Sequence, residues 1–140
     1  MISRRIFIGC ALCAAVGLIA APVEAQTTAA ADAVTRQLLS RADLPGSSYE
    51  AVQVNVVVKP AGFIAWHTHP GIESSCVLEG EATLMVKSRP NLRLQVGQSL
   101  MIPPETPHAV QNSNSVLRIA ATFIVEKGKP LSTPVQDPNI

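Results

Sequence analysis

The chain has 140 residues, of which 47% are hydrophobic and 15% are charged, with a formal net charge of +1. This length allows one domain with a single core. The near-neutral charge excludes the strongly basic surface with which a protein binds nucleic acid or an acidic membrane.

Residues 1–25 show the three-part pattern of an export signal. Arg4 and Arg5 precede an apolar run over residues 6–21, which is shorter than a comfortable membrane span, and residues 23–25 suit a signal peptidase. The arginine pair resembles the bacterial twin-arginine signal, and an ordinary Sec signal or a retained anchor is the alternative. We therefore expect a cleaved signal over 1–25 and a periplasmic or secreted protein that does not contact the membrane after cleavage.

Loss of the signal would leave one cysteine. Cys10 and Cys13 fall within residues 1–25, so Cys76 alone remains and an internal disulfide is excluded. The remaining chain holds nine basic and nine acidic residues, which again gives no sign of a nucleic-acid partner.

The rest of the chain divides into a flexible lead-in over 26–44, a β-domain over 45–126 and an extended tail over 127–140. Residues 34–44 of the lead-in are compatible with either a short helical turn or extended chain. In the β-domain, short apolar or alternating segments lie between Gly and Pro turns, which predicts strands. The expected strands are residues 52–58, 64–69, 75–78, 82–86, 92–96, 99–102, 109–111, 117–120 and 122–125.

These short strands predict an all-β fold, either a closed β-barrel or a double-sheet jelly roll. The segments 75–78 and 82–86 are expected to form a hairpin around Glu79-Gly80-Glu81.

Four residues in this domain make a full ligand set for a divalent metal: His67, His69, Glu73 and His108. His67 and His69 are two residues apart, which on a strand places both imidazoles on one face. His108 is distant in sequence, so the fold must bring it back to the pair.

The spacing of these residues resembles two motifs of the cupin superfamily. Residues 64–80 match the first motif as His67-x-His69, three residues, Glu73, six residues and Gly80. Residues 97–112 match the second as Gly97, five residues and Pro103, then His108, three residues and Asn112.

The resemblance is to a small single-domain cupin of the type-2 conserved barrel and covers roughly residues 50–125. It implies a conical β-barrel with the four ligands inside, and it implies a homodimer.

Two positions depart from the family pattern. Ala61 stands where the family has glycine before the histidine pair, and Glu105 replaces the glycine of the second motif's Pro-x-Gly. A left-handed backbone at Glu105 would cost about 1 kcal/mol. We interpret the Glu105 side chain as a solvated turn residue and not as part of the site.

Four ligands leave two of six octahedral positions open for water, substrate or dioxygen. Twin-arginine export would load the metal in the cytoplasm, which favours Mn or Fe, although Ni, Co, Cu and Zn also suit the ligands.

Strand alternation directs Cys76 away from the metal and Trp66 out of the barrel. The larger apolar candidates for the cavity wall are Phe63, Trp66, Met85, Met101 and Phe123, with Leu84 or Val86 as further candidates. No residue is assigned as a catalytic acid or base.

Two functions fit this sequence. The first is an enzyme in which the metal acts on a small organic molecule by a dioxygenase-type or isomerase-type reaction. The alternative is a non-enzymatic periplasmic cupin that binds a metal or small ligand for storage, sensing or delivery.

Overall fold

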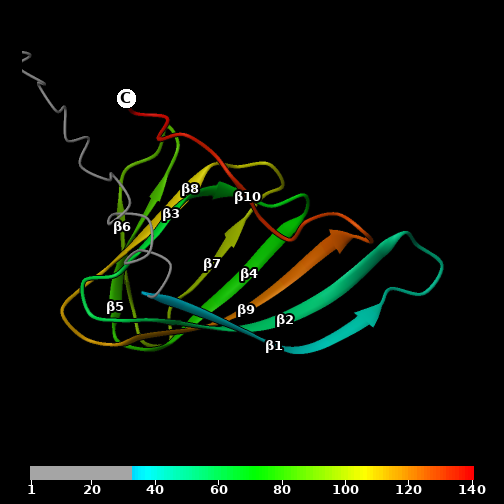
Figure 1. The fold of residues 1–140 in the computed structure, drawn as a ribbon, viewed down its shortest axis with the longest axis horizontal. Coiled ribbons are helices and arrows are strands. Elements are labelled where there is room, and N and C mark those ends of the chain that lie inside the picture. Colours follow the sequence, from blue (N-terminus) through cyan, green and yellow to red (C-terminus); the bar gives the residue numbers. More distant parts are fainter. Residues whose placement is uncertain (1–32) are drawn as a thin grey trace, which may run out of the picture.

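The computed structural model describes residues 33–140, which form two five-stranded antiparallel sheets that face each other (Figure 1). Sheet 1 has the order β1-β2-β9-β4-β7 and sheet 2 the order β10-β3-β8-β5-β6. The expected signal over residues 1–25 and the start of the lead-in lie outside the described residues. The strands are β1 Val34–Asp43, β2 Tyr49–Val58, β3 Phe63–Thr68, β4 Ile72–Glu79, β5 Glu81–Val86, β6 Leu92–Gln95, β7 Ser99–Ile102, β8 His108–Asn112, β9 Leu117–Glu126 and β10 Thr133–Pro134.

The core lies between the sheets and is built from strands that alternate buried and exposed residues. On β2 every second residue from Val52 to Val58 is buried, and each faces a buried residue of β9, as in the pair Val56 and Ile119. Full burial of one such side chain stabilises the fold by about 1.5–3 kcal/mol. The double-sheet form of the predicted all-β fold is thus confirmed. The expected strands 117–120 and 122–125 are one continuous strand, β9.

Strand β1 agrees with the extended alternative for residues 34–44, but it is a paired strand and not a flexible lead-in. Val34–Asp43 pairs with β2 along its whole length, with an irregularity between Leu38 and Ser40. Nine of its ten residues are exposed, so backbone hydrogen bonds to β2 hold it and not burial. Prediction from apolar alternation cannot detect such a strand.

The hairpin predicted around Gly80 is wrong. β4 pairs with β7 and β9 in sheet 1, whereas β5 pairs with β6 and β8 in sheet 2, so Gly80 is a corner between the sheets. Its φ is +78°, and a Cβ there would lie 2.3 Å from the Val116 carbonyl oxygen. A tight turn between two apolar strands looks the same in sequence whether the chain folds back or crosses between sheets.

Asn112, the last residue of the second motif, has a structural role. Its buried side-chain amide donates to the carbonyl oxygens of Val58, Lys59 and Ser115, which links the β2–β3 turn to the β8–β9 turn. The β2–β3 turn places Ala61 at φ +57°, so the departure from glycine puts an alanine in left-handed backbone.

Residues 33–140 contain no helix with the length and apolarity needed to span a membrane.

Replacement of Gly71 should test the packing of the loop that joins the two halves of the first motif. A Cβ on Gly71 would lie 1.9 Å from the Ile124 carbonyl oxygen of β9, so the backbone must move. We expect Gly71→Ala to lower the free energy of unfolding by about 3 kcal/mol. Gly46→Ala is the matched control, because Gly46 has φ +72° but open space around it, and should cost about 1 kcal/mol. Chemical denaturation measures both, and equal losses would contradict the close approach of Gly71 to β9.

Candidate metal centre

An irregularity in β3 directs His67 toward the space between the sheets. The register with β8 advances three residues along β3, from Ile64 to His67, but only two along β8, from Val110 to His108. This extra residue is a β-bulge, which re-aims the side chains that follow it. Ile64 and His67 therefore line the same cavity although they are an odd number of residues apart.

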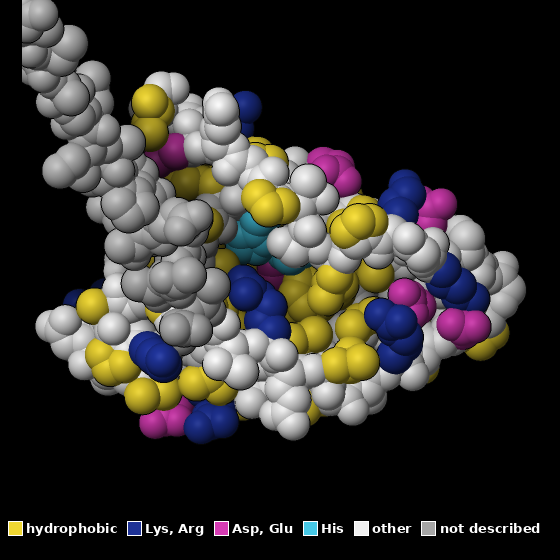
Figure 2. All heavy atoms as spheres, in the orientation of Figure 1, with side chains coloured by type: hydrophobic (Ala, Val, Ile, Leu, Met, Phe, Trp, Pro, Cys, Tyr) yellow, Lys and Arg dark blue, Asp and Glu magenta, His cyan; other side chains and the backbone are white. Residues whose placement is uncertain are grey.

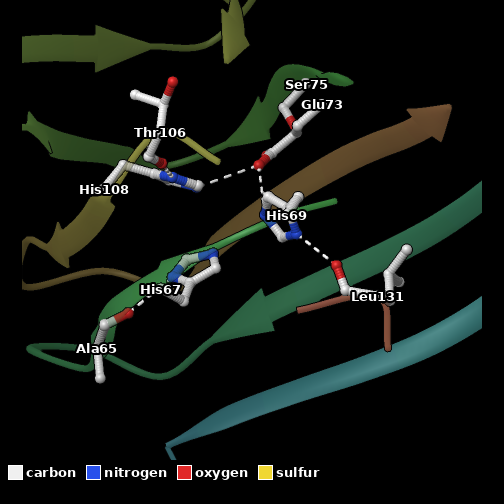
Figure 3. A network of polar contacts seen from close by, with 8 residues as sticks. All are labelled: Ala65, His67, His69, Glu73, Ser75, Thr106, His108 and Leu131. Atoms are coloured by element: carbon white, nitrogen blue, oxygen red, sulfur yellow. Dashed lines mark hydrogen bonds and ion pairs between the residues drawn. The ribbon is translucent and has the colours of Figure 1, made fainter. Parts of the chain in front are cut away.

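The four predicted ligands come together as one group (Figure 3). His67 lies on β3, His69 directly after it, Glu73 on β4 and His108 on β8, so the site joins both sheets. One potential ligand atom from each residue lies within 4.8 Å of the others. Glu73 Oε2 is 2.9 Å from His69 Nε2 and 3.2 Å from His108 Nε2. Donor atoms bound side by side to one metal are about 3 Å apart, so the set fits a single ion.

Backbone carbonyls determine which nitrogen of each imidazole faces the centre. The Nδ1 atoms of His67, His69 and His108 lie 2.7, 2.6 and 2.9 Å from the carbonyl oxygens of Ala65, Leu131 and Thr106, respectively. A carbonyl oxygen only accepts a hydrogen bond, so each Nδ1 carries the proton and donates it. In the neutral ring Nε2 then presents a lone pair, which is the arrangement found in metal-ligating histidines.

Within residues 33–140, two buried atoms at the centre have no hydrogen-bond partner: His69 Nε2 and Glu73 Oε2. Each is an acceptor in the state described above, and they face each other at 2.9 Å. Buried acceptors that meet in this way need a proton or a cation between them. Glu73 Oε1, in contrast, accepts a hydrogen bond of 2.6 Å from Ser75 Oγ. The residues present therefore fit a divalent metal.

The protonation states of His67 and Glu73 are suited to binding a cation. Burial, together with the nearby His108, lowers the pKa of His67 to about 4, so this ring is neutral at pH 7. Burial alone would raise the pKa of Glu73, but contacts with His108, His69 and Ser75 outweigh it and hold the pKa well below its usual range. The centre thus offers one ionised carboxylate, Glu73, and one neutral imidazole, His67.

The cavity beside the ligands has a volume of about 40 Å³ and is otherwise mainly apolar. Of the expected wall residues, Phe123 and Leu84 line it, and the Phe123 ring lies 4.7 Å from the His69 ring. The other walls are Val56, Ile64, Ser75, Leu100, Val110, Ile119 and Ala121. From outside, Figure 2 shows histidine side chains at the bottom of a hollow between the sheets.

Several wall candidates from the sequence lie elsewhere. Phe63 and Met101 are exposed, Met85 and Val86 do not line this cavity, and Met101 borders a separate apolar pocket of about 360 Å³ between β5–β6 and β7. Trp66 is also absent from the cavity wall, as expected, but is buried. Cys76 does not line the cavity, in agreement with its predicted direction.

Two segments outside β3 hold His69 in place. The backbone N–H of Glu105 donates to the His69 carbonyl at 2.9 Å, and the Leu131 carbonyl accepts from its ring. Glu105 adopts φ +54° and its side chain is exposed, as expected for a turn residue in this position. β10 pairs with the end of β3, so the segment after β9 lies along the ligand strand.

Sequence reasoning missed the roles of Ser75 and Leu131. Ser75 shares a strand face with Glu73, which was a usable signal, but a serine at that spacing is common. Leu131 acts through its backbone carbonyl, which leaves no trace in the side-chain pattern.

Loss of the Ser75 hydroxyl should loosen Glu73. We expect Ser75→Ala to weaken divalent-metal binding by about tenfold or more, because partners of a ligating carboxylate contribute at that level. Ser74→Ala is the matched control, since Ser74 is exposed on the opposite face of β4. Competition with a chelating indicator measures both, and equal affinities would show that Ser75 does not orient the carboxylate.

A chain shortened after Pro130 loses the acceptor for His69 Nδ1. We expect its metal dissociation constant to rise about 10–100-fold, because His69 can then adopt the other tautomer or rotate. A chain shortened after Gln136 keeps Leu131 and β10 and should bind metal like the full chain. Similar affinities in the two shortened chains would contradict the role of the Leu131 carbonyl.

A family model described as a cupin domain matches residues 54–125, whereas no curated protein matches. Among solved structures, DMSP lyase DddQ from Ruegeria pomeroyi DSS-3 is 20% identical, with a TM-score of 0.64 over 77% of this chain and 54% of that one. A crystal structure of the DMSP lyases RdDddP and RnDddQII gives 22% identity and a TM-score of 0.57 over 61% and 44%.

A cupin-2 domain from Rhodospirillum rubrum is 18% identical, with a TM-score of 0.60 over 75% of this chain and 67% of that one. The chain thus spans about half the length of the lyase chains, and the identities are low enough that these structures support the fold alone. The family match covers more than half of the chain, including all four ligands, and this chain belongs to the cupin family.

Proposed function

We propose that this protein is a metal-dependent cupin enzyme that acts on a small organic molecule. The observation that carries the proposal is the convergence of three imidazoles, whose Nδ1 atoms are engaged by backbone carbonyls, and the Glu73 carboxylate in a buried, mainly apolar cavity. A structural metal site would not need an opening to solvent, whereas here histidines are visible in a hollow (Figure 2).

The residues of the cavity have three separate roles: they bind the ion, orient the carboxylate or exclude water. His67, His69, Glu73 and His108 would hold the ion, and Ser75 keeps one carboxylate oxygen engaged so that the other faces the histidines. Phe123 and the aliphatic wall exclude water from the space beside them. A bound divalent metal would supply Lewis acidity or dioxygen chemistry. Among the described residues of the cavity wall, the four ligands are the only titratable groups.

For the reaction we propose three possible classes. Oxygen insertion or isomerisation follows from the family, and the DMSP lyases among the similar structures add elimination as a third class. For the metal we propose Mn or Fe, with Ni, Co, Cu and Zn as alternatives that the same donors accept.

A non-enzymatic role is the second candidate and has one observation in its favour. The cavity beside the ligands measures about 40 Å³, which is room for only a few water molecules. A protein that stores, senses or delivers a metal would need no more space than this.

Export and dimer formation stay predictions. They rest on residues 1–25, outside the described part of the chain, and on the family resemblance. Fractionation of cells and sizing of the mature protein would test them.

Removal of one ligand tests the assignment of the centre. We expect His108→Ala to reduce the bound divalent metal from about one ion per chain to less than about 0.1, because three donors hold it far more weakly. Glu105→Ala is the control: the residue is exposed and contributes its backbone N–H, which alanine retains. Elemental analysis of natively produced protein gives both values, and metal loss in Glu105→Ala but not in His108→Ala would refute the ligand set.

Activity then separates the two candidate functions. Metal-loaded protein should consume dioxygen with a phenolic or diketone compound, or cleave DMSP, and His108→Ala should do neither. Stoichiometric metal without turnover of any class would favour the binding function.

A further inference from the structure

Strand β1 presents one arginine on the face that looks toward the metal centre. Residues directly opposite each other in an antiparallel pair share a face, and Arg36 lies opposite Val56, which lines the cavity. The next positions on the same face, Val34 and Leu38, lie opposite the core residues Val58 and Val54. Arg36 is therefore on the inner side of sheet 1, at its edge.

The guanidinium of Arg36 interacts electrostatically with the Glu73 carboxylate of the centre. Burial lowers the pKa of Arg36, and electrostatic attraction to Glu73 opposes that change. The residue as a whole stays exposed, and its side chain is on the face of β1 that continues the cavity wall formed by Val56. Figure 2 shows a Lys or Arg side chain directly beside the histidines in the hollow, with an acidic group behind it.

Among residues 33–140, Arg36 differs from most other arginines because no carboxylate of these residues pairs with it. Arg41, Arg93 and Arg118 lie 3.0, 2.6 and 3.3 Å from carboxylates of Glu50, Glu81 and Glu79. Within residues 33–140 Arg36 forms no ion pair and no side-chain hydrogen bond. The Glu73 carboxylate instead lies beside His69 and His108 and accepts a hydrogen bond from Ser75.

A partly desolvated guanidinium without a carboxylate suits the binding of one from outside. Its planar fork matches the two oxygens of a carboxylate, and one positive charge balances one negative charge. Protection of the β1 edge against pairing with other chains is the alternative role for a charge there. That role requires no ligand and is served equally well on the outer face.

We propose that Arg36 is a substrate-binding residue that selects small molecules with a carboxylate group and holds this group at the cavity entrance. The rest of the ligand then points toward His67, His69, Glu73 and His108. This inference rests on the proposed function, because it concerns the molecule that reaches the same centre.

The test uses Co(II)-loaded protein and simple probes: acetate, propionate and benzoate, each beside its neutral amide, and inorganic phosphate. Changes in visible absorption report ligands that reach the metal, and calorimetry gives the affinities. We expect wild-type protein to prefer each carboxylate to its amide. Arg36→Gln should weaken carboxylate binding by about tenfold or more, leave amide binding within about twofold and leave the metal content unchanged.

Two further variants separate recognition from a general loss of charge. Arg36→Lys keeps the charge without the fork and should restore part of the affinity. Arg89→Gln removes the same charge from the pocket between β5–β6 and β7, where Arg89 also has no ion pair among the described residues, and should bind carboxylates like wild type. Thermal melting establishes that each variant is folded.

Unchanged carboxylate affinity in Arg36→Gln, a similar loss in Arg89→Gln, or tighter binding of phosphate than of any carboxylate would overturn the inference. Aggregation of Arg36→Gln with normal carboxylate binding would assign it to edge protection instead. Absence of bound metal in the wild-type protein would refute the proposed function, and calorimetry of the metal-free protein with benzoate would then still decide the role of Arg36.

Discussion

Three hydrogen bonds from imidazole Nδ1 atoms to backbone carbonyls are the constraint on which this centre depends. They leave Nε2 lone pairs directed at a carboxylate that is itself buried. An uncompensated charge in such surroundings costs several kcal/mol. The fold therefore holds together groups that repel one another without a cation, and it does so with rigid backbone acceptors instead of mobile side chains. The orientation of the four potential ligands therefore depends on the geometry of the two sheets.

Much of the centre could be predicted from sequence because histidine is rare in this chain and His67, His69 and Glu73 are close together in sequence. The chain has three histidines, and all three converge with Glu73. The strands of the core were also predictable, since Val52 to Val58 alternate as a half-buried strand must. Glu105 was interpreted as a solvated turn residue, and its side chain is exposed; its backbone is left-handed, with φ +54°.

The incorrect sequence predictions share a physical cause. The pattern of side chains along a segment does not specify which strands or backbone groups it will pair with. β1 buries too little to show alternation, so Val34–Asp43 looked like a lead-in. β4 and β5 looked like a hairpin because a short turn between apolar strands does not reveal which neighbours they will pair with. The bulge before His67 and the carbonyl of Leu131 are backbone features. The position of Arg36 on the inner face of sheet 1 follows from the register of β1, a strand that was not predicted.

The contact between His69 and Leu131 has a consequence for the order of folding. These residues are 62 positions apart, and β9 must be in place before the segment that follows it can lie against β3. Contacts of such long sequence separation form late, after the loop entropy between them has been overcome. A nascent chain that has reached β8 already holds all four donors, yet lacks the acceptor that orients one of them. Tight metal capture should therefore mark a domain whose sheets are both complete, and partly made chains should release the ion.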